Sequence, residues 1–311
     1  MSGTVPLGEV AKSVTPRFNI VGLVPSVLLA VNIGVLIASG SFAGVPSVHL
    51  LLLRSREVDV LDASLLFFVV FSIALVVHPF QLLLVRILEG YWDETPVLRK
   101  IKFVGMEINR RRWAKFRRES DDTELLSRLY PRFTPEFLPT RLGNVLRAAE
   151  RRAGRQHGFT RPGEMFPRIF PYVSAALSLG ISSARDTLDT ACRMCVVLWT
   201  LAFLDGIVLL ADGALPASYG AWLGLPVAAA LLAWLSYRAA VRAAGAYGRF
   251  LFYVFDLHRQ DLIRALGYEP PERASDEVEL AEKITAWLVN DGPAPEQYRK
   301  VPGQDSAAQS S

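Results

Sequence analysis

The sequence has few of the residues that build compact catalytic or metal centres. Only two cysteines and four histidines occur in 311 residues. The cysteines, Cys192 and Cys195, lie three positions apart beside an apolar run, so they supply neither a disulfide framework nor a complete set of zinc ligands. We expect them to be small residues packed at a membrane edge, with acylation of a cysteine as the minor alternative.

The common signatures of catalytic and cofactor sites are also missing. The sequence contains no Walker-type loop, no GxSxG, no HExxH, no dinucleotide fingerprint and no paired CxxC. We therefore expect no cofactor, no metal and no enzymatic activity. A membrane enzyme acting on lipid is an alternative, with candidates in the stretch "FDLHRQD". Its Asp256, His258 and Asp261 do not share one face of a helix well, which weakens a metal or acid–base site.

Long stretches of the chain lack charged residues altogether. Residues 18–53 contain no Asp, Glu, Lys or Arg, and 51% of all residues are hydrophobic. The mean hydropathy is +0.27, and the apolar residues gather in blocks of the length that crosses a hydrocarbon core of about 30 Å. This pattern argues against an ordinary soluble enzyme.

The apolar blocks predict an all-α integral membrane protein with four transmembrane helices arranged as two hairpins. The first hairpin is expected at 18–90 and the second at 191–240. Cleavage of the first span as a signal peptide is an alternative, but its apolar block is long for a signal and is interrupted by Pro25 and Asn32. The four predicted spans are 20–39, 63–85, 192–211 and 217–238.

The distribution of Lys and Arg predicts the orientation of these spans. Only Arg54 and Arg56 lie between the first two spans and none between the last two, whereas residues 91–186 hold 19 Lys and Arg against 11 Asp and Glu. The N-terminal tail 1–17, the central segment 91–190 and the C-terminal part are therefore predicted to be cytoplasmic. The many Arg and Ala residues are typical of a GC-rich bacterial genome, so we expect a multi-pass protein of the inner membrane.

The central segment carries its whole excess of positive charge in twenty residues, and Glu107 is the one acid among them. Val97, Ile101, Val104 and Ile108 follow helical spacing, which predicts a basic amphipathic helix that begins after Pro96. Such a helix suits the anionic lipid headgroups of the inner leaflet. A solvated face and a protein partner remain alternatives, and nucleic acid is not expected. The basic residues are Arg99, Lys100, Lys102, Arg110, Arg111, Arg112, Lys115, Arg117 and Arg118.

Further cytoplasmic helices are expected on both sides of the second hairpin. Residues 137–159 predict a helix capped by Thr140 and stopped by Gly158, followed by a proline-rich ordered loop. His157 is expected to be a surface residue near the end of that helix.

The C-terminal part is predicted to hold cytoplasmic helices over 241–290. Residues 237–267 predict a helix that leaves the membrane, and a second helix is expected to begin with Ser275 as its cap. The acidic start of that second helix suggests the hypothesis that it faces the basic stretch 99–118. Residues 291–311 are expected to be disordered.

A few polar residues fall inside the predicted spans, where they are costly and point to function. At 1.5 Å per residue, Asp205 and Asn32 lie about 20 and about 21 Å from the inner edge, so they are matched in depth and able to form a hydrogen bond. His78 lies only about 11 Å from that edge. These three residues form a polar layer that either joins helices or lines a pathway.

Three functions remain open from the sequence. The first is a non-enzymatic scaffold whose cytoplasmic helices bind a protein partner or organise at the inner leaflet. The second is a channel or small transporter that uses Asn32, His78 and Asp205, which four spans would build only as a homo-oligomer. The third is the membrane enzyme acting on lipid.

Overall fold

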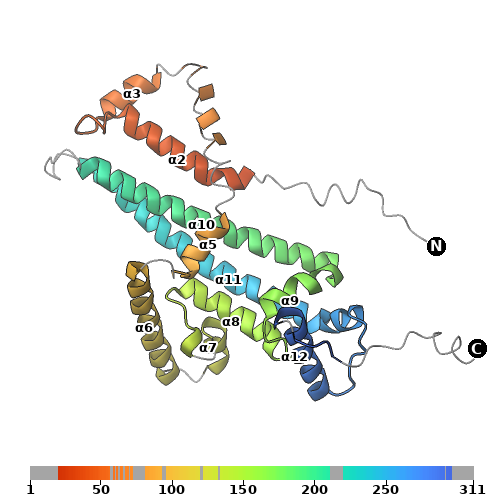
Figure 1. Ribbon diagram of the computed structural model, residues 1–311. Helices are drawn as coiled ribbons and strands as arrows, with labels where there is room; N and C mark the ends of the chain where they lie inside the picture. The colour runs from red at the N-terminus through yellow and green to blue at the C-terminus, as the bar shows by residue number, and fades with distance from the viewer. Residues whose placement is uncertain are drawn as a thin grey trace, which may run out of the picture. The chain divides into compact units, whose positions relative to one another are not determined.

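All secondary structure among the described residues is helical, which confirms the predicted all-α class (Figure 1). Two compact units divide the chain: unit 1 comprises residues 1–81 and 193–234, and unit 2 comprises residues 82–192 and 235–311. The computed structural model describes residues 20–56, 59, 61, 64–65, 67–69, 71–72, 81–92, 96–119, 122–131, 134–210, 220–290 and 292–295.

Two helices among the described residues are long and apolar enough to cross a membrane, α10 (Ala175–Leu210) and α11 (Gly224–Ala265), the latter extended by the short helix η5 (Gly220–Leu223). They contain the third predicted span and most of the fourth. Helix α10 begins at Ala175 rather than near residue 192, because residues 175–191 contain no proline that would stop it. Helix α11 continues past the predicted span, as expected, and Gly267 with a φ of 87° ends that segment.

The described part of unit 1 also contains α2 (Ile20–Ala38) and α3 (Val48–Arg56). Helix α2 coincides with the first predicted span, and its apolar part Val24–Ala38 is shorter than the two long helices. Helix α3 lies between the first two predicted spans, a stretch for which no secondary structure was predicted. About half of the second predicted span, 63–85, lies outside the described residues, including the whole of 73–80. The apolar core of unit 1 joins Leu29 of α2 to residues of α10 and α11: Leu198, Leu201, Ala229 and Ala233.

Unit 2 holds most of the remaining helices. The basic segment forms α6 as predicted, and the proline-rich stretch predicted as a loop instead forms α9 and η3, since Pro162 occupies the first turn of α9, where its missing N–H costs nothing. The bounds are α5 (Gln81–Glu89), α6 (Pro96–Glu119), α7 (Thr123–Leu129), η2 (Thr134–Glu136), α8 (Arg141–Arg155), α9 (Pro162–Ile169), η3 (Phe170–Tyr172) and α12 (Ala274–Asn290).

Helix α8 begins and ends at the predicted signals. The Thr140 hydroxyl accepts the amide N–H of Gly143 at 3.0 Å and donates to the carbonyl of Glu89 at 2.8 Å, so the cap also ties α8 to α5. Gly143 makes this approach possible, because a Cβ there would stand 2.1 Å from the Glu89 oxygen. Gly158 follows the helix with a φ of 83°.

Within unit 2, α8 packs alongside α11, and the first half of α10 packs on the other side of α11 (Figure 1). Gly248 of α11 lies against Ala149, and Gly180 of α10 lies against the ring of Phe250. Small residues at both contacts let the helix backbones come close. The apolar interior forms two clusters, one around Leu142, Leu188 and Ala244 and the other around Phe159, Phe255 and Ile284.

Helix α12 docks its apolar face on the second cluster. Ala281 and Ile284 are fully buried there, and the carboxylate of Glu277 accepts a 2.5 Å hydrogen bond from Nε of Arg259 on α11. The hypothesis that the acidic start of this helix faces the basic stretch 99–118 is wrong for Glu277, because Arg259 takes its carboxylate.

Two further predictions for the C-terminal part need correction. The cap predicted at Ser275 is also wrong: α12 begins one residue earlier, and the Ser275 hydroxyl donates to Asp276. The O–H of Tyr268 donates to the carbonyl of Pro295 at 3.2 Å. The chain is therefore held at least to that residue of the segment predicted as disordered, and residues 296–311 lie outside the described part.

Candidate functional site

The polar pair expected inside the membrane is present in unit 1. The side-chain amide of Asn32 on α2 donates a 2.7 Å hydrogen bond to a carboxylate oxygen of Asp205 on α10. Asp205 is only 1% exposed. A buried carboxylate with a single short partner from another helix is a strong local constraint on how these helices pack. His78, the third residue predicted for the polar layer, lies outside the described residues.

The basic stretch forms one continuous helix, α6, that presents a stripe of side chains to the outside of unit 2. Ile101, Val104 and Ile108 on this stripe are 50%, 58% and 44% exposed. The same three- and four-residue spacing continues through Arg111 and Lys115 and on to Arg118, all of them exposed. One face of the helix thus changes from apolar to basic halfway along its length.

The other predicted members of the basic patch are spread around α6. Arg99, Lys100, Arg112 and Arg117 are exposed, whereas Lys102 and Arg110 are partly buried. The guanidinium of Arg117 lies 5.2 Å from the ring centroid of Trp113. Two acids on the helix form ion pairs with this patch, Glu107 with Arg111 at 3.0 Å and Glu119 with Lys115 at 3.8 Å. Both pairs are exposed and contribute little to stability.

An adjacent face of α6 is fixed to the segment that leads into α8. The buried side-chain amide of Asn109 donates to the carbonyls of Gly105 and Pro139 at 3.0 and 2.8 Å. Pro139 fills the space beside Gly105, where a Cβ would stand 2.7 Å from the proline ring. The ring of Phe137 packs edge-on against Trp113. The exposed stripe is therefore held on a helix with a defined orientation within unit 2.

The start of α8 adds a second basic group beside α6, which the sequence did not indicate. Arg112 of α6 and Arg141 in the first turn of α8 both lie near Tyr130, where their charges partly offset the burial that raises its pKa. The hydroxyl of Tyr237 on α11 accepts the backbone N–H groups of Arg141 and Leu142 at 3.1 and 3.2 Å. The first turn of α8 is thus bound to the point where α11 passes from apolar to basic sequence.

A group of partly buried acids lies where α5, α8 and α10 meet in unit 2. Burial, aided by the negative charge of Glu150, raises the pKa of Glu89 to about 7, against the opposing charges of Arg86 and Arg147. Burial also raises the pKa of Glu150 and of Tyr247 nearby. Asp189 on α10 also raises the pKa of Glu89. Sequence reasoning missed this group, because its acids are separated by 39 residues or more along the chain (189 minus 150 for Asp189 and Glu150).

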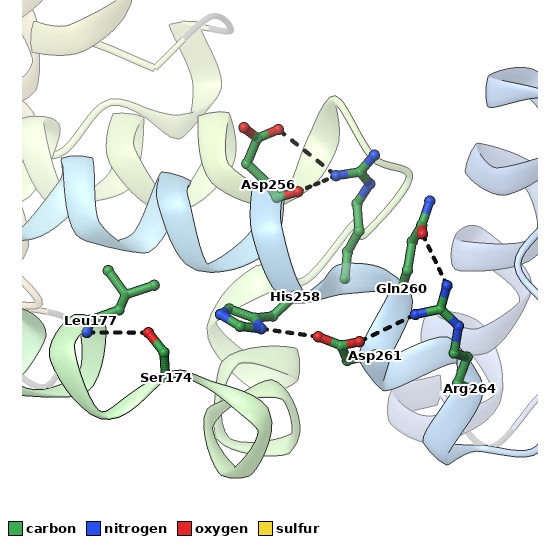
Figure 2. Close-up of polar contacts among 8 residues, drawn as sticks. Ser174, Leu177, Asp256, His258, Gln260, Asp261 and Arg264 are labelled. Carbon is green, nitrogen blue, oxygen red and sulfur yellow. Dashed lines mark hydrogen bonds and ion pairs between the residues drawn. The ribbon is translucent and has the colours of Figure 1, made fainter.

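The candidate acid–base residues of "FDLHRQD" do not converge on one site. Nδ1 of His258 lies 3.0 Å from the carboxylate of Asp261, and Arg264 also contacts that carboxylate at 3.3 Å. Asp256 points elsewhere (Figure 2), with its carboxylate 3.8 Å from Arg259 and 3.6 Å from Nε2 of His157. Only the contact between Asp256 and His157 joins α11 to another segment of unit 2; the others lie within α11.

His157 is less exposed than the sequence suggested, since its side chain retains only 13% exposure. Burial and the charge of Arg259 lower its pKa. Cys192 and Cys195 are both buried, and they form no disulfide. Among the described residues, no group of three or more His, Cys, Asp or Glu side chains is arranged to hold a metal ion.

Comparison of the chain with protein-family models, with curated proteins and with solved structures gave no match. The geometry itself indicates two candidate sites: the buried Asn32–Asp205 pair in unit 1 and the exposed stripe of α6 in unit 2.

Proposed function

We propose that this protein is a multi-pass protein of the bacterial inner membrane whose helical cytoplasmic part acts as an interaction scaffold. The supporting observation is that α10 and α11 each run unbroken from an apolar segment into the buried core of unit 2. Because α10 and α11 continue into the core of unit 2, this unit stays at the membrane. Its outer surface is then available to partners.

In this proposal four spans cross the membrane, and both termini and unit 2 lie in the cytoplasm. The excess of Lys and Arg over residues 91–186 supports that orientation. The scarcity of catalytic signatures and the separate contacts of Asp256, His258 and Asp261 favour a binding role over a catalytic one.

The test is topology mapping with single cysteines in the full-length chain. Cys192 and Cys195 are first replaced with alanine, and one cysteine is then placed at Phe42, between α2 and α3, or at Leu257 on α11; these side chains are 61% and 67% exposed. A membrane-impermeant maleimide should label Phe42→Cys in intact spheroplasts and Leu257→Cys only after the membrane is opened. Labelling of Leu257→Cys from the outside would contradict the proposal.

The second candidate function is an oligomeric channel or small transporter, and the buried Asn32–Asp205 pair favours it. A conducting path through four-span subunits requires several copies, so the mass of the nanodisc-bound protein comes first. If Asp205 lines a path, Asp205→Asn changes ion flux in proteoliposomes. If the pair only joins helices, Asp205→Asn leaves flux at the background level and changes subunit number or thermal stability instead.

A further inference from the structure

The exposed stripe of α6 lies beside the face that is fixed to unit 2, and it carries three branched apolar side chains. The described residues of unit 2 leave Ile101, Val104 and Ile108 about half exposed. The question is what binds to this stripe. The stripe continues directly into Arg111, Lys115 and Arg118. An occupant of this face must therefore accept apolar contact at one end and positive charge at the other.

The position of α6 within unit 2 further limits the kinds of partner that could bind this stripe. The middle of α6 is bound through Asn109 to Pro139, directly before α8. The first turn of α8 is bound in turn by the hydroxyl of Tyr237. Tyr237 is the last residue before Arg238 in the predicted fourth span, and tyrosine favours the boundary between hydrocarbon and headgroups. This chain of contacts joins the middle of α6, through the start of α8, to the tyrosine expected at that boundary.

We propose that the α6 face, together with Arg112 and Arg141, docks on the anionic surface of the inner leaflet. In this arrangement Ile101, Val104 and Ile108 enter the region below the headgroups, and the basic half of the stripe lies against lipid phosphates. Each Lys or Arg near such a surface contributes about 1 kcal/mol at physiological salt. The inference rests on the proposed function, since it needs unit 2 on the cytoplasmic side of the membrane.

A second copy of the chain is the other occupant that an apolar stripe suggests. It explains the observations less well, because a self-complementary contact would bring the basic ends of two stripes together or leave them facing apolar side chains. An anionic bilayer satisfies both halves of the stripe at once, with the hydrocarbon boundary for one half and phosphates for the other.

The test uses the full-length protein, reconstituted in nanodiscs of phosphatidylcholine alone or of equal parts phosphatidylcholine and phosphatidylglycerol. With Cys192 and Cys195 replaced by alanine, a polarity-sensitive fluorophore is attached to Val104→Cys or, as the matched control, to Leu257→Cys. The two native side chains are 58% and 67% exposed. The Val104 probe should shift to shorter wavelength and be quenched by lipid-borne quenchers in the anionic discs, while the Leu257 probe stays in water.

Charge variants separate docking from general electrostatics. Arg111→Glu with Arg112→Glu should remove most of the anionic-lipid shift of the Val104 probe, as should high salt. Arg249→Glu with Arg273→Glu changes net charge equally at exposed sites outside α6 and should leave the shift in place. Equal probe signals in both lipid mixtures, or a shift that depends on protein concentration rather than lipid, would overturn the inference.

The topology experiment distinguishes the two possible failures. If Leu257→Cys is labelled only after the membrane is opened but the Val104 probe stays in water, only the docking inference fails. If Leu257→Cys is labelled from outside, the proposed function itself fails.

Discussion

Helices α6 and α12 of unit 2 are both amphipathic, but α12 buries its apolar face and α6 leaves its apolar stripe exposed. Helix α12 buries Ala281 and Ile284 completely against the cluster around Phe159 and Phe255. Helix α6 leaves Ile101, Val104 and Ile108 about half exposed. A periodic apolar stripe in sequence predicts that a helix has a face to cover, and it does not identify the partner that covers it.

The polar neighbours of the two stripes mark the difference. On α12, the carboxylate of Glu277 forms its hydrogen bond within unit 2, because it accepts from Nε of Arg259 at 2.5 Å. On α6, the basic residues at the end of the stripe are exposed, and the ion pairs of Arg111 with Glu107 and of Lys115 with Glu119 lie within the same helix. A face satisfied within the fold stabilises unit 2, and a face left open is available to the membrane.

The largest expected loss of stability comes from the buried apolar face of α12. Ile284 is fully buried, so Ile284→Ala removes buried methyl groups and leaves a cavity that costs about 2–5 kcal/mol. Hydrogen exchange of the α12 amides in the reconstituted full-length protein measures this loss as faster opening. Leu257→Ala, at an exposed site on α11, is the control and should leave those amides unchanged. Unaltered α12 protection in Ile284→Ala would contradict the docking of this helix on the core.

A smaller loss is expected where α12 meets the end of α8. Gly158 has a φ of 83°, and a Cβ there would stand 2.2 Å from the backbone oxygen of Val278. Gly158→Ala therefore costs about 1–2 kcal/mol for the left-handed backbone alone, and the clash adds to this by displacing α12. Gly163→Ala is the matched control, since no heavy atom lies within 4 Å of its ideal Cβ. The check is α12 exchange in both variants; equal rates would mean that α12 does not rest on this turn.

Local signals in the sequence were enough to place several features of unit 2. Thr140 and Gly158 bound the α8 segment as predicted, and Pro96 opens α6. The match in depth of Asn32 and Asp205 predicted a contact that the structure contains. Each of these follows from spacing along one helix or from simple rise per residue, so no knowledge of the tertiary fold was needed.

Features that depend on long-range packing were missed. The Tyr237 hydroxyl that binds the start of α8 and the burial of Glu89 beside Glu150 join segments far apart in the chain. The start of α10 was placed too late because hydropathy marks the apolar part of a helix rather than its ends. The helix α9 was read as a loop because prolines at 162 and 167 suggested a break, although both fit in one short helix.

The partly buried acids where α5, α8 and α10 meet provide a pH-dependent effect on stability of intermediate size. Burial and Glu150 raise the pKa of Glu89 to about 7 from 4.5, so the folded protein binds its proton more tightly than the unfolded chain does. The stabilisation from protonated Glu89 is present in full below about pH 4.5 and is lost as the pH rises through about 7. Arg86 and Arg147 oppose this rise in the pKa of Glu89, and Asp189 adds to it.

Replacing the acid should remove this dependence. Glu89→Gln is expected to raise the melting temperature at about pH 8, where the native carboxylate is charged and partly buried, and to change it little at about pH 5. Melting curves of the purified protein in the same detergent at both pH values are the measurement. A stabilisation that is equal at both pH values would exclude the titration of Glu89 as its source.

The smallest loss of stability is expected from the exposed stripe of α6, where the same change from isoleucine to alanine is made as on the buried face of α12. Ile108 is 44% exposed on α6, and in dilute detergent solution Ile108→Ala should change the stability of unit 2 by less than about 0.5 kcal/mol. Because Ile284→Ala removes identical atoms, the two variants differ only in what surrounds the side chain, and exchange of the α6 and α12 amides compares them directly. If Ile108→Ala costs as much as Ile284→Ala in detergent, the stripe is covered by protein and the membrane is not needed to explain it. If Ile108→Ala is neutral in detergent but weakens α6 protection in anionic nanodiscs, the lipid surface completes for α6 what the core cluster completes for α12.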